Sequence, residues 1–188
     1  MKKILIATNN KGKVKEIKEI LNDYELLTLD EVNGNINVVE DGETFEENSE
    51  KKAIEIGRKT GLPTISDDSG LCIEILDNWP GVHTARFLGK DATDRQRNEA
   101  ILAKMKNCKN RNAKVVCAIS YYENGKVSTV KGEIQGKITD QLRGKNGFGF
   151  DEIFELESGK TLAELSSNEK NKISSRRIAL QKLKEIID

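Results

Sequence analysis

The hydrophobic and polar positions change their period several times along the chain, which is typical of alternating strands and helices. Residues 3–7, KILIA, are a short apolar run that predicts a buried strand. After this run, Val14, Ile17, Ile20 and Leu21 recur at helical spacing. This pattern predicts a helix that directly follows the first strand.

Two further helices begin at capping boxes, in which a Ser or Thr is followed three residues later by Glu or Gln. The box at Thr44 predicts a helix to about residue 60, which Gly61 ends. The box at Thr93 predicts a helix to about residue 105. A last helix is expected from about residue 168 to the end, because its apolar residues share one face: Ile173, Leu180, Leu183 and Ile187.

Strand signals dominate the middle of the chain. Residues 114–122 and 127–134 are joined by a turn around Asn124-Gly125, which favours positive φ and predicts a β-hairpin. Residues 64–66 and 71–76 are two shorter strand candidates, separated by Asp-Asp-Ser-Gly. Strands that alternate with helices predict an α/β fold.

Length and composition agree with one soluble domain over residues 1–188. The sequence is 36% hydrophobic and 33% charged and has no internal repeat or linker. No apolar run approaches the 18 or so residues of a membrane helix. The apolar run after Met-Lys-Lys is too short for a signal peptide, so a cytoplasmic location without membrane contact is expected.

Charge and residue counts disfavour several classes of function. The 31 basic and 31 acidic residues cancel, whereas a duplex nucleic-acid binder normally carries a basic excess. His83 is the only histidine, which disfavours a Ser-His-Asp triad and a histidine-rich metal site. The three cysteines form no CxxC pair, so free thiols in a reducing compartment are expected.

A candidate anion site lies where the first strand gives way to the first helix. Thr8, Asn10 and Lys13 fall at this junction, where backbone N–H groups and the helix dipole favour negative charge. The pattern is not that of a Walker loop. The alternative is an ordinary Asn cap with solvated lysines.

Acidic residues form a candidate metal site. Glu40 precedes the helix that begins at Thr44, and Asp67 and Asp68 lie between the two shorter strands. One or two carboxylates with substrate phosphates suffice for Mg²⁺. If Ile65 points inward, the two aspartates point to different sides, so that one could hold metal while the other meets water. A solvated turn is the alternative.

Two segments near the C-terminus could recognise a ligand. Glycines in GKNGFGFDEIF allow close approach of the backbone, and Phe148 and Phe150 could stack on a base or fill the core. DEIF also predicts the start of a strand. Lys170, Ser174 and Arg177 are expected on one face of the last helix, where they could bind phosphate or carbonyl oxygen or simply be solvated.

Taken together and in order, the motifs resemble the inosine triphosphate pyrophosphatase family over essentially the whole chain. They are TNNKGK, EDGETFEENSEKKA, SDDSGL, PGVHTARF, GFGFDEIF and EKNKISSR. The resemblance implies a two-lobed mixed α/β fold, with a central twisted mixed sheet, flanking helices and a cleft between lobes, usually in a homodimer. It implies Mg²⁺-dependent hydrolysis of non-standard purine triphosphates (ITP, dITP and XTP) to the monophosphate and pyrophosphate.

The resemblance also implies roles for single residues. Asp68 would be the catalytic base with Asp67 beside it, and Glu40, Asp67 and Asp68 would hold the metal. The implied substrate contacts are Thr8, Asn10, Lys13, Lys52, Ser69, Phe148, Gly149, Phe150, Asp151, Lys170, Ser175 and Arg176.

Three departures from the family pattern concern the base pocket. Ser175 replaces the usual histidine, Phe150 replaces a tryptophan or tyrosine, and Glu152 replaces a proline. Because serine both donates and accepts hydrogen bonds, we expect looser discrimination against standard purines such as GTP. Hydrolysis itself should be unaffected, since no departure touches the predicted metal site.

Two alternatives stay open at this stage: a pyrophosphatase for another modified nucleotide, and a nucleotide sensor that binds without hydrolysis. The carboxylate cluster argues against the sensor, because binding alone does not need it. A single-strand nucleic-acid binder could use the two phenylalanines, but zero net charge gives it little electrostatic attraction.

Overall fold

The computed structural model describes residues 2–32 and 36–187, which form two compact units. Unit 1 comprises Met1–Asp68, Cys117–Gly132 and Ser175–Asp188, and unit 2 comprises Ser69–Val116 and Glu133–Ser174. Three strands contribute to both units: β3 (Thr64–Ile73), β5 (Asn112–Glu123) and β6 (Lys126–Ile138). The prediction of one domain over residues 1–188 stays a prediction.

Unit 1 contains strands in the order β2-β1-β3-β5-β6. β1 (Lys3–Ile6) runs parallel to β2 (Glu25–Thr28) and to β3. In unit 2, β4 (Trp79–Pro80) pairs with β3 and β7 (Phe154–Glu155) pairs with β6, both antiparallel. The strands and helices together confirm the predicted mixed α/β class.

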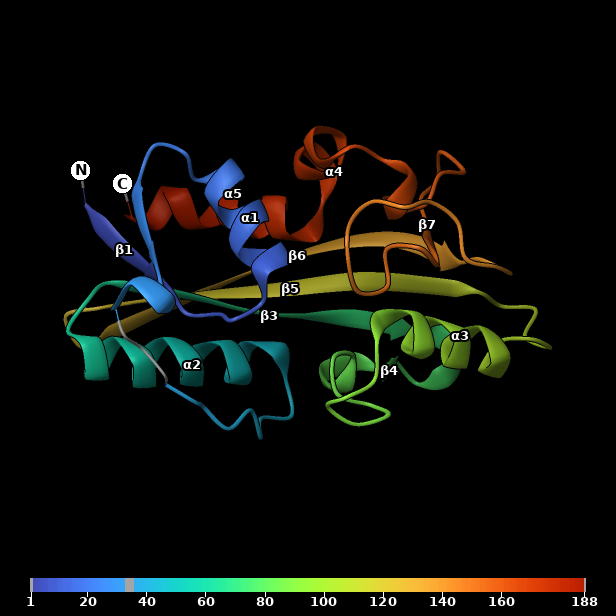
Figure 1. Cartoon of the computed structure of the whole chain (residues 1–188), viewed down its shortest axis with the longest axis horizontal. Coiled ribbons are helices and arrows are strands. Elements are labelled where there is room, and N and C mark those ends of the chain that lie inside the picture. The colour runs from blue at the N-terminus through green and yellow to red at the C-terminus, as the bar shows by residue number, and fades with distance from the viewer. Residues whose placement is uncertain (1, 33–35, 188) are drawn as a thin grey trace. The chain divides into compact units, whose positions relative to one another are not determined.

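Helices cover both faces of the strands in unit 1. Figure 1 shows α1 (Lys11–Ile20) and α5 (Ser175–Ile187) on one face and α2 (Phe45–Thr60) on the other. Side chains of β1 alternate between these faces, because Ile4 and Ile6 pack with α1 and α5 whereas Leu5 packs with Ile56 of α2. This alternation explains why residues 4–7, ILIA, are apolar throughout.

Unit 2 has its own core. In Figure 1, α3 (Asp94–Lys104) lies on one face of its strands and α4 (Ser167–Ile173) on the other. Phe154, Leu71 and Ile101 are fully buried there or nearly so. Short 3₁₀ helices complete the chain: Asp30–Val32, Glu74–Leu76, Gly81–His83 and Leu162–Glu164. Among the described residues, no helix is long and apolar enough to span a membrane.

The local signals in the sequence are confirmed at helix ends and at the hairpin. Both predicted capping boxes are present, at Thr44 with Glu47 and at Thr93 with Gln96. Gly61 ends α2 at a φ of 70°. Asn124-Gly125 takes φ values of 49° and 81° between β5 and β6. These signals depend only on neighbouring residues, so the sequence reveals them directly.

The prediction of two short strands around the aspartates is wrong. Residues 64–73 form one continuous strand, β3, with Asp67 and Asp68 inside it, and residues 74–76 are a 3₁₀ helix. Both carboxylates are buried, and each meets polar partners on its own side of the strand. Those partners come from distant parts of the sequence, so the local pattern indicated a turn instead.

The prediction of one unbroken last helix is also wrong. Ser174 has an extended backbone (φ −64°, ψ 155°) and separates α4 from α5. Lys170, Ser174 and Arg177 therefore do not share one helical face. Ile173, predicted in the apolar face, is 41% exposed, whereas Leu180 and Leu183 are fully buried.

The strand predicted at DEIF is shorter than expected. Only Phe154–Glu155 pair as β7, while the preceding residues form a turn. In that turn Asp151 and Ile153 donate their backbone N–H groups to the carbonyls of Phe148 and Phe150. Those groups are satisfied locally and cannot join the sheet.

Candidate functional site

The junction between β1 and α1 forms a polar helix start, as predicted. Asn10 is the N-cap of α1, and its side chain accepts the backbone N–H of Lys13 at 3.1 Å. Thr8 Oγ1 accepts the N–H of Asn10 at 3.2 Å. Lys13 points back to β3, where its Nζ lies 3.2 Å from Asp67 Oδ2. The junction therefore places a cation and a helix N-terminus beside the aspartates.

Asp67 is a fully buried carboxylate held by two cations. Its Oδ2 accepts from Arg176 Nη2 of α5 at 2.7 Å, in addition to the contact with Lys13. Arg176 also forms an ion pair with Glu16 of α1. Burial alone would raise the pKa of Asp67, but the charges of Lys13 and Arg176 outweigh it and hold the pKa well below its usual range. Asp67 therefore stays ionised.

Asp68 faces the other side of β3, toward α2. Asn48 donates from Nδ2 to Asp68 Oδ2 at 3.1 Å, and Asn48 Oδ1 accepts the N–H of Gly42 at 2.8 Å. Burial raises the pKa of Asp68, the positive charges of Lys52 and Lys13 oppose this, and the negative charges of Glu40 and Asp67 add to it. The two adjacent carboxylates thus lie on opposite sides of the strand and meet different partners, as the alternation of a strand predicts.

Lys52 links the acidic residues on the α2 side. Its Nζ donates to the backbone carbonyl of Asp67 at 2.7 Å and forms an ion pair with Glu40. The charges of Asp68, Asp67 and Glu40 keep the pKa of Lys52 above its ordinary value, although burial lowers it. A charged lysine is therefore fixed beside Asp68.

The predicted magnesium site at the acidic residues stays a prediction, and any such ion would need phosphates to help hold it. Within residues 2–32 and 36–187, no three Asp, Glu, His or Cys side chains group closely enough to hold a metal alone. Mg²⁺ commonly takes only one or two protein carboxylates and leaves the remaining positions to water and phosphates. Asp68 and Glu40 repel each other near Lys52, and a divalent cation would offset that repulsion. The predicted metal role of Asp67 stays a prediction, since its Oδ2 already meets two cations.

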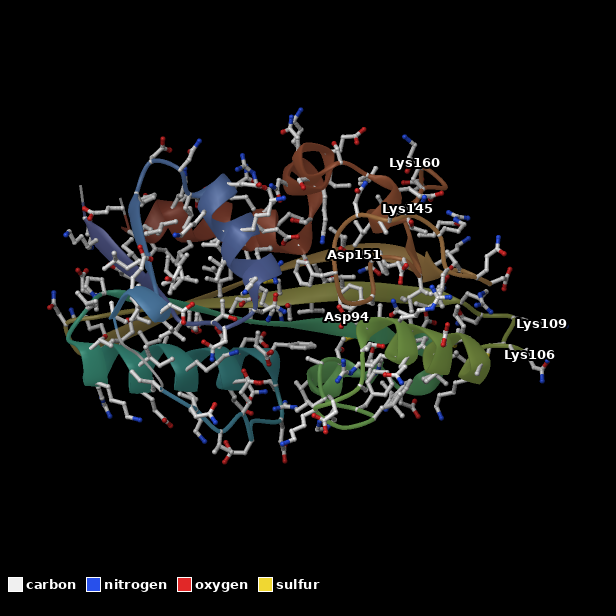
Figure 2. All side chains as sticks on the ribbon, viewed as in Figure 1. Asp94, Lys106, Lys109, Lys145, Asp151 and Lys160 are labelled. Atoms are coloured by element: carbon white, nitrogen blue, oxygen red, sulfur yellow. The ribbon has the colours of Figure 1, made fainter. Side chains whose placement is uncertain are left out.

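In unit 2, the glycine-rich segment and α4 bring a second predicted group together. Asp151 Oδ2 accepts the backbone N–H of Phe148 at 3.0 Å and forms a buried ion pair with Lys170. Lys170 Nζ lies 4.6 Å from the centroid of the Phe148 ring. Figure 2 labels Asp151 in this segment. Phe148 is partly exposed, and a cation lies over its ring.

The other residues predicted to contact the substrate differ in how far they are buried. Phe150 packs against the core of unit 2, which agrees with its alternative role as a core residue. Ser69 lies in β3, directly after the aspartates, and is partly exposed. Ser175 is buried at the start of α5. Substrate contacts by these residues stay predictions, as do those of Thr8, Asn10, Lys13, Lys52, Phe148, Gly149, Asp151, Lys170 and Arg176.

Sequence reasoning missed several residues that position these groups. Asn48 lies four residues before Lys52 on α2, and Glu16 lies three residues after Lys13 on α1, so helical spacing could have identified both. Cys117 of β5 lies 3.9 Å from Asp67 Oδ2, and burial raises the pKa of its thiol to about 12. No local signal distinguished this thiol from the other two.

Over nearly its whole length, the chain is similar to members of one protein family. The model of the Ham1 family matches residues 4–186. Relatives named dITP/XTP pyrophosphatase from Clostridium perfringens and Bacillus subtilis are 44% and 41% identical, covering 98% and 100% of this chain and 97% and 98% of their own. The solved structure of the Staphylococcus aureus Ham1 protein has a TM-score of 0.89 at 37% identity, covering 99% of this chain and 98% of its own.

Proposed function

The chain belongs to the Ham1 family, and from this premise we propose that it hydrolyses non-standard purine nucleoside triphosphates. The substrates would be dITP, ITP and XTP, and the products the nucleoside monophosphate and pyrophosphate. Two full-length relatives above 40% identity bear the name dITP/XTP pyrophosphatase, which supports this choice. Removing such nucleotides would clear them from the nucleotide pool.

One observation carries the proposal: β3 directs two adjacent carboxylates to opposite faces, with Lys13 beside the carboxylate of Asp67 and Asn48 beside that of Asp68. Phosphoryl transfer asks a protein mainly for positioning and charge neutralisation. Asp67 positions Lys13 at the start of α1, where the lysine and the helix N-terminus can bind phosphate oxygens. Lys52 supplies positive charge on the α2 side.

Asp68 is the proposed general base. It is oriented by Asn48 and is less completely buried than Asp67. A carboxylate in this position can take the proton of the attacking water. Mg²⁺, when held by Asp68 and Glu40, would neutralise phosphate charge and favour loss of that proton.

Base recognition is proposed for the Phe148 segment. The Phe148 ring would stack on the base, and such stacking is worth about 1–3 kcal/mol per base. Inosine and xanthine carry an acceptor oxygen at position six, whereas adenine carries an amino donor. Donors such as Lys170 and Arg176 would leave adenine with an unpaired donor, which is costly, whereas Ser175 can also accept a hydrogen bond and would discriminate less.

We further propose that the protein is a cytoplasmic homodimer that depends on Mg²⁺. The support is the resemblance of the motifs to the family. Activity lost on chelation and recovered with Mg²⁺ would support the metal, and sedimentation equilibrium would measure the oligomeric state.

The test is pyrophosphate release from dITP, XTP, ITP, GTP and ATP in the presence of Mg²⁺. We expect rapid hydrolysis of the first three and a loss of at least about a hundredfold in Asp68→Asn. Asp140→Asn is the matched control, because that carboxylate is 90% exposed. If Ser175 loosens the pocket, GTP should be less than about a thousandfold poorer than ITP. Binding without hydrolysis would favour the sensor, and hydrolysis of only another nucleotide would favour a different pyrophosphatase.

A further inference from the structure

Helix α3 holds the glycine-rich segment of unit 2 from outside. Asp94 Oδ2 accepts the backbone N–H of Gly149 at 2.7 Å, and Asn98 Nδ2 donates to the carbonyl of the same residue at 2.9 Å. Asp94 and Asn98 are four residues apart on α3 and therefore lie on one face of the helix. One helix face thus binds both polar groups of a single residue.

The two hydrogen bonds from Asp94 and Asn98, here called the clamp on Gly149, act at the residue where they affect the segment most. Its φ of 64° lies in the left-handed region, although an added Cβ would meet nothing within 4 Å. Glycine is therefore favoured at this position because of the backbone conformation, and not because a larger side chain would lack space. Its two neighbours are Phe148 and Phe150, so the conformation of Gly149 affects the backbone positions from which both side chains project.

The anchor on α3 is itself rigid. The capping box of Thr93 and Gln96 fixes the first turn, and the acidic Asp94 lies at the favourable N-terminal end. The other carboxylate oxygen of Asp94 lies 3.8 Å from Arg97 Nη1. Asn98 is buried, and its Nδ2 also lies 3.3 Å from a carboxylate oxygen of Glu152. Rotation of either side chain would break more than one contact.

The segment is also held from within. Asp151 accepts the N–H of Phe148, so two carboxylates bind the consecutive N–H groups of Phe148 and Gly149. Figure 2 shows Asp94 and Asp151 together where α3 meets the glycine-rich segment. A hydrogen bond from N–H to an ionised carboxylate is stronger than one between neutral groups. The segment is thus fixed before any ligand arrives.

We propose that Asp94 and Asn98 are positioning residues that fix Phe148 for recognition of the purine base. This inference rests on the proposed function, since it assigns the segment to the base of the triphosphate. The contacts of Asp94 and Asn98 described above all lie within unit 2. Their loss should therefore weaken nucleotide binding through the base and leave the binding of phosphate groups unchanged.

The test compares KM for dITP with the inhibition constant of inorganic pyrophosphate, which has no base. Asp94→Ala is the first variant, because the Asp94 side chain is 54% exposed and its truncation should not prevent folding. We expect KM to rise about tenfold, because the segment would then have to be ordered when the nucleotide binds. The values of kcat and of the inhibition constant of pyrophosphate should stay within about twofold of those of the unaltered protein. Asn98→Ala should change KM, kcat and the inhibition constant in the same way. Because Asn98 is buried, thermal unfolding would check that this variant folds.

Two further variants make the test specific. Asp94→Asn keeps an acceptor for the Gly149 N–H and should restore a KM near that of the unaltered protein. Glu99→Ala removes an exposed carboxylate from the same helix and should change neither constant. An unchanged KM in both Asp94→Ala and Asn98→Ala, or a parallel rise of KM and the pyrophosphate constant, would overturn the inference. Absence of hydrolysis by the unaltered protein would instead overturn the proposed function, and this inference with it.

Discussion

Asp67 and Asp68 are neighbours in the chain, yet their carboxylates have different tasks. Asp67 is closed in by Lys13 and Arg176, which keep it ionised and make it an anchor for cations. Asp68 meets Asn48 and the negative charge of Glu40, and burial raises its pKa. Environments that push two pKa values apart separate a fixed charge from a group that can exchange a proton.

Replacing Arg176 tests the anchor. Arg176→Met removes the guanidinium but keeps an apolar side chain, and it leaves Asp67 and Glu16 buried with one cation fewer. Breaking a buried pair in this way costs about 3–5 kcal/mol. Urea unfolding at neutral pH, in the presence of a chelator, should show this loss. Lys184→Met is the control, because its partner Asp23 is 75% exposed and the expected loss is below about 1 kcal/mol.

The same variant predicts a pH dependence. The pKa of Asp67 is lower in the folded than in the unfolded protein, so its contribution is complete above the unfolded value of about 3.9. That contribution is lost as the pH falls through the lower folded pKa. The difference in stability between the unaltered protein and Arg176→Met should therefore narrow on acidification. A difference that grew on acidification would contradict the assignment of Asp67 as the anchored charge.

At the scale of elements, β3 is the strand around which unit 1 organises its polar groups. Side chains at alternate positions face α1 and α5 or face α2, so Ile65 and Asp67 share one side while Ser66 and Asp68 share the other. Arg176 reaches Asp67 only because α5 packs on the same face as α1. The position of α5 is therefore as important to the site as the aspartates.

Gly132→Ala tests that position. A Cβ at Gly132 of β6 would lie 2.2 Å from the carbonyl oxygen of Ser175 and 2.7 Å from the backbone nitrogen of Ala179. Backbone cannot yield as a flexible side chain would, so β6 and α5 must separate. We expect a loss of about 1–3 kcal/mol in urea unfolding and a drop in activity.

Lys126→Ala, an exposed substitution in the same strand, is the control and should stay within about 0.5 kcal/mol. An unchanged unfolding midpoint in Gly132→Ala would show that the contact between β6 and α5 is looser than the structure indicates.

Helix starts, the hairpin turn and the first strand could be predicted, because each depends on residues that lie close together in sequence. The continuity of β3 could not, since Asp67 is 109 residues from Arg176 and a carboxylate without that partner favours a turn. The motifs did indicate Lys13 and Asp68 as candidate site residues. They could not reveal the clamp on Gly149, whose partners on α3 are 51 and 55 residues away.

For the whole molecule, charge balance limits the possible partners. The 31 basic and 31 acidic residues give zero formal charge at pH 7, with a sequence pI of about 6.7. Many charges are paired at the surface, as in Lys2 with Glu123 and Lys114 with Glu133. Such a surface gives a polyanion little long-range attraction, whereas a single triphosphate needs only a few local cations.

Affinity for single-stranded DNA would distinguish a protein that binds nucleic-acid strands from a nucleotide enzyme. Non-specific binding to nucleic acid depends on the release of counterions by clustered lysines and arginines, with typical dissociation constants of about 10⁻⁴–10⁻⁶ M at physiological salt. With zero net charge, we expect no change in the fluorescence anisotropy of a labelled oligothymidine at about 10 μM protein and physiological salt. The same preparation should hydrolyse dITP, which serves as the control for folding. Binding that weakens steeply with added salt would show that local basic groups outweigh the overall balance and would restore the strand-binding alternative for Phe148 and Phe150.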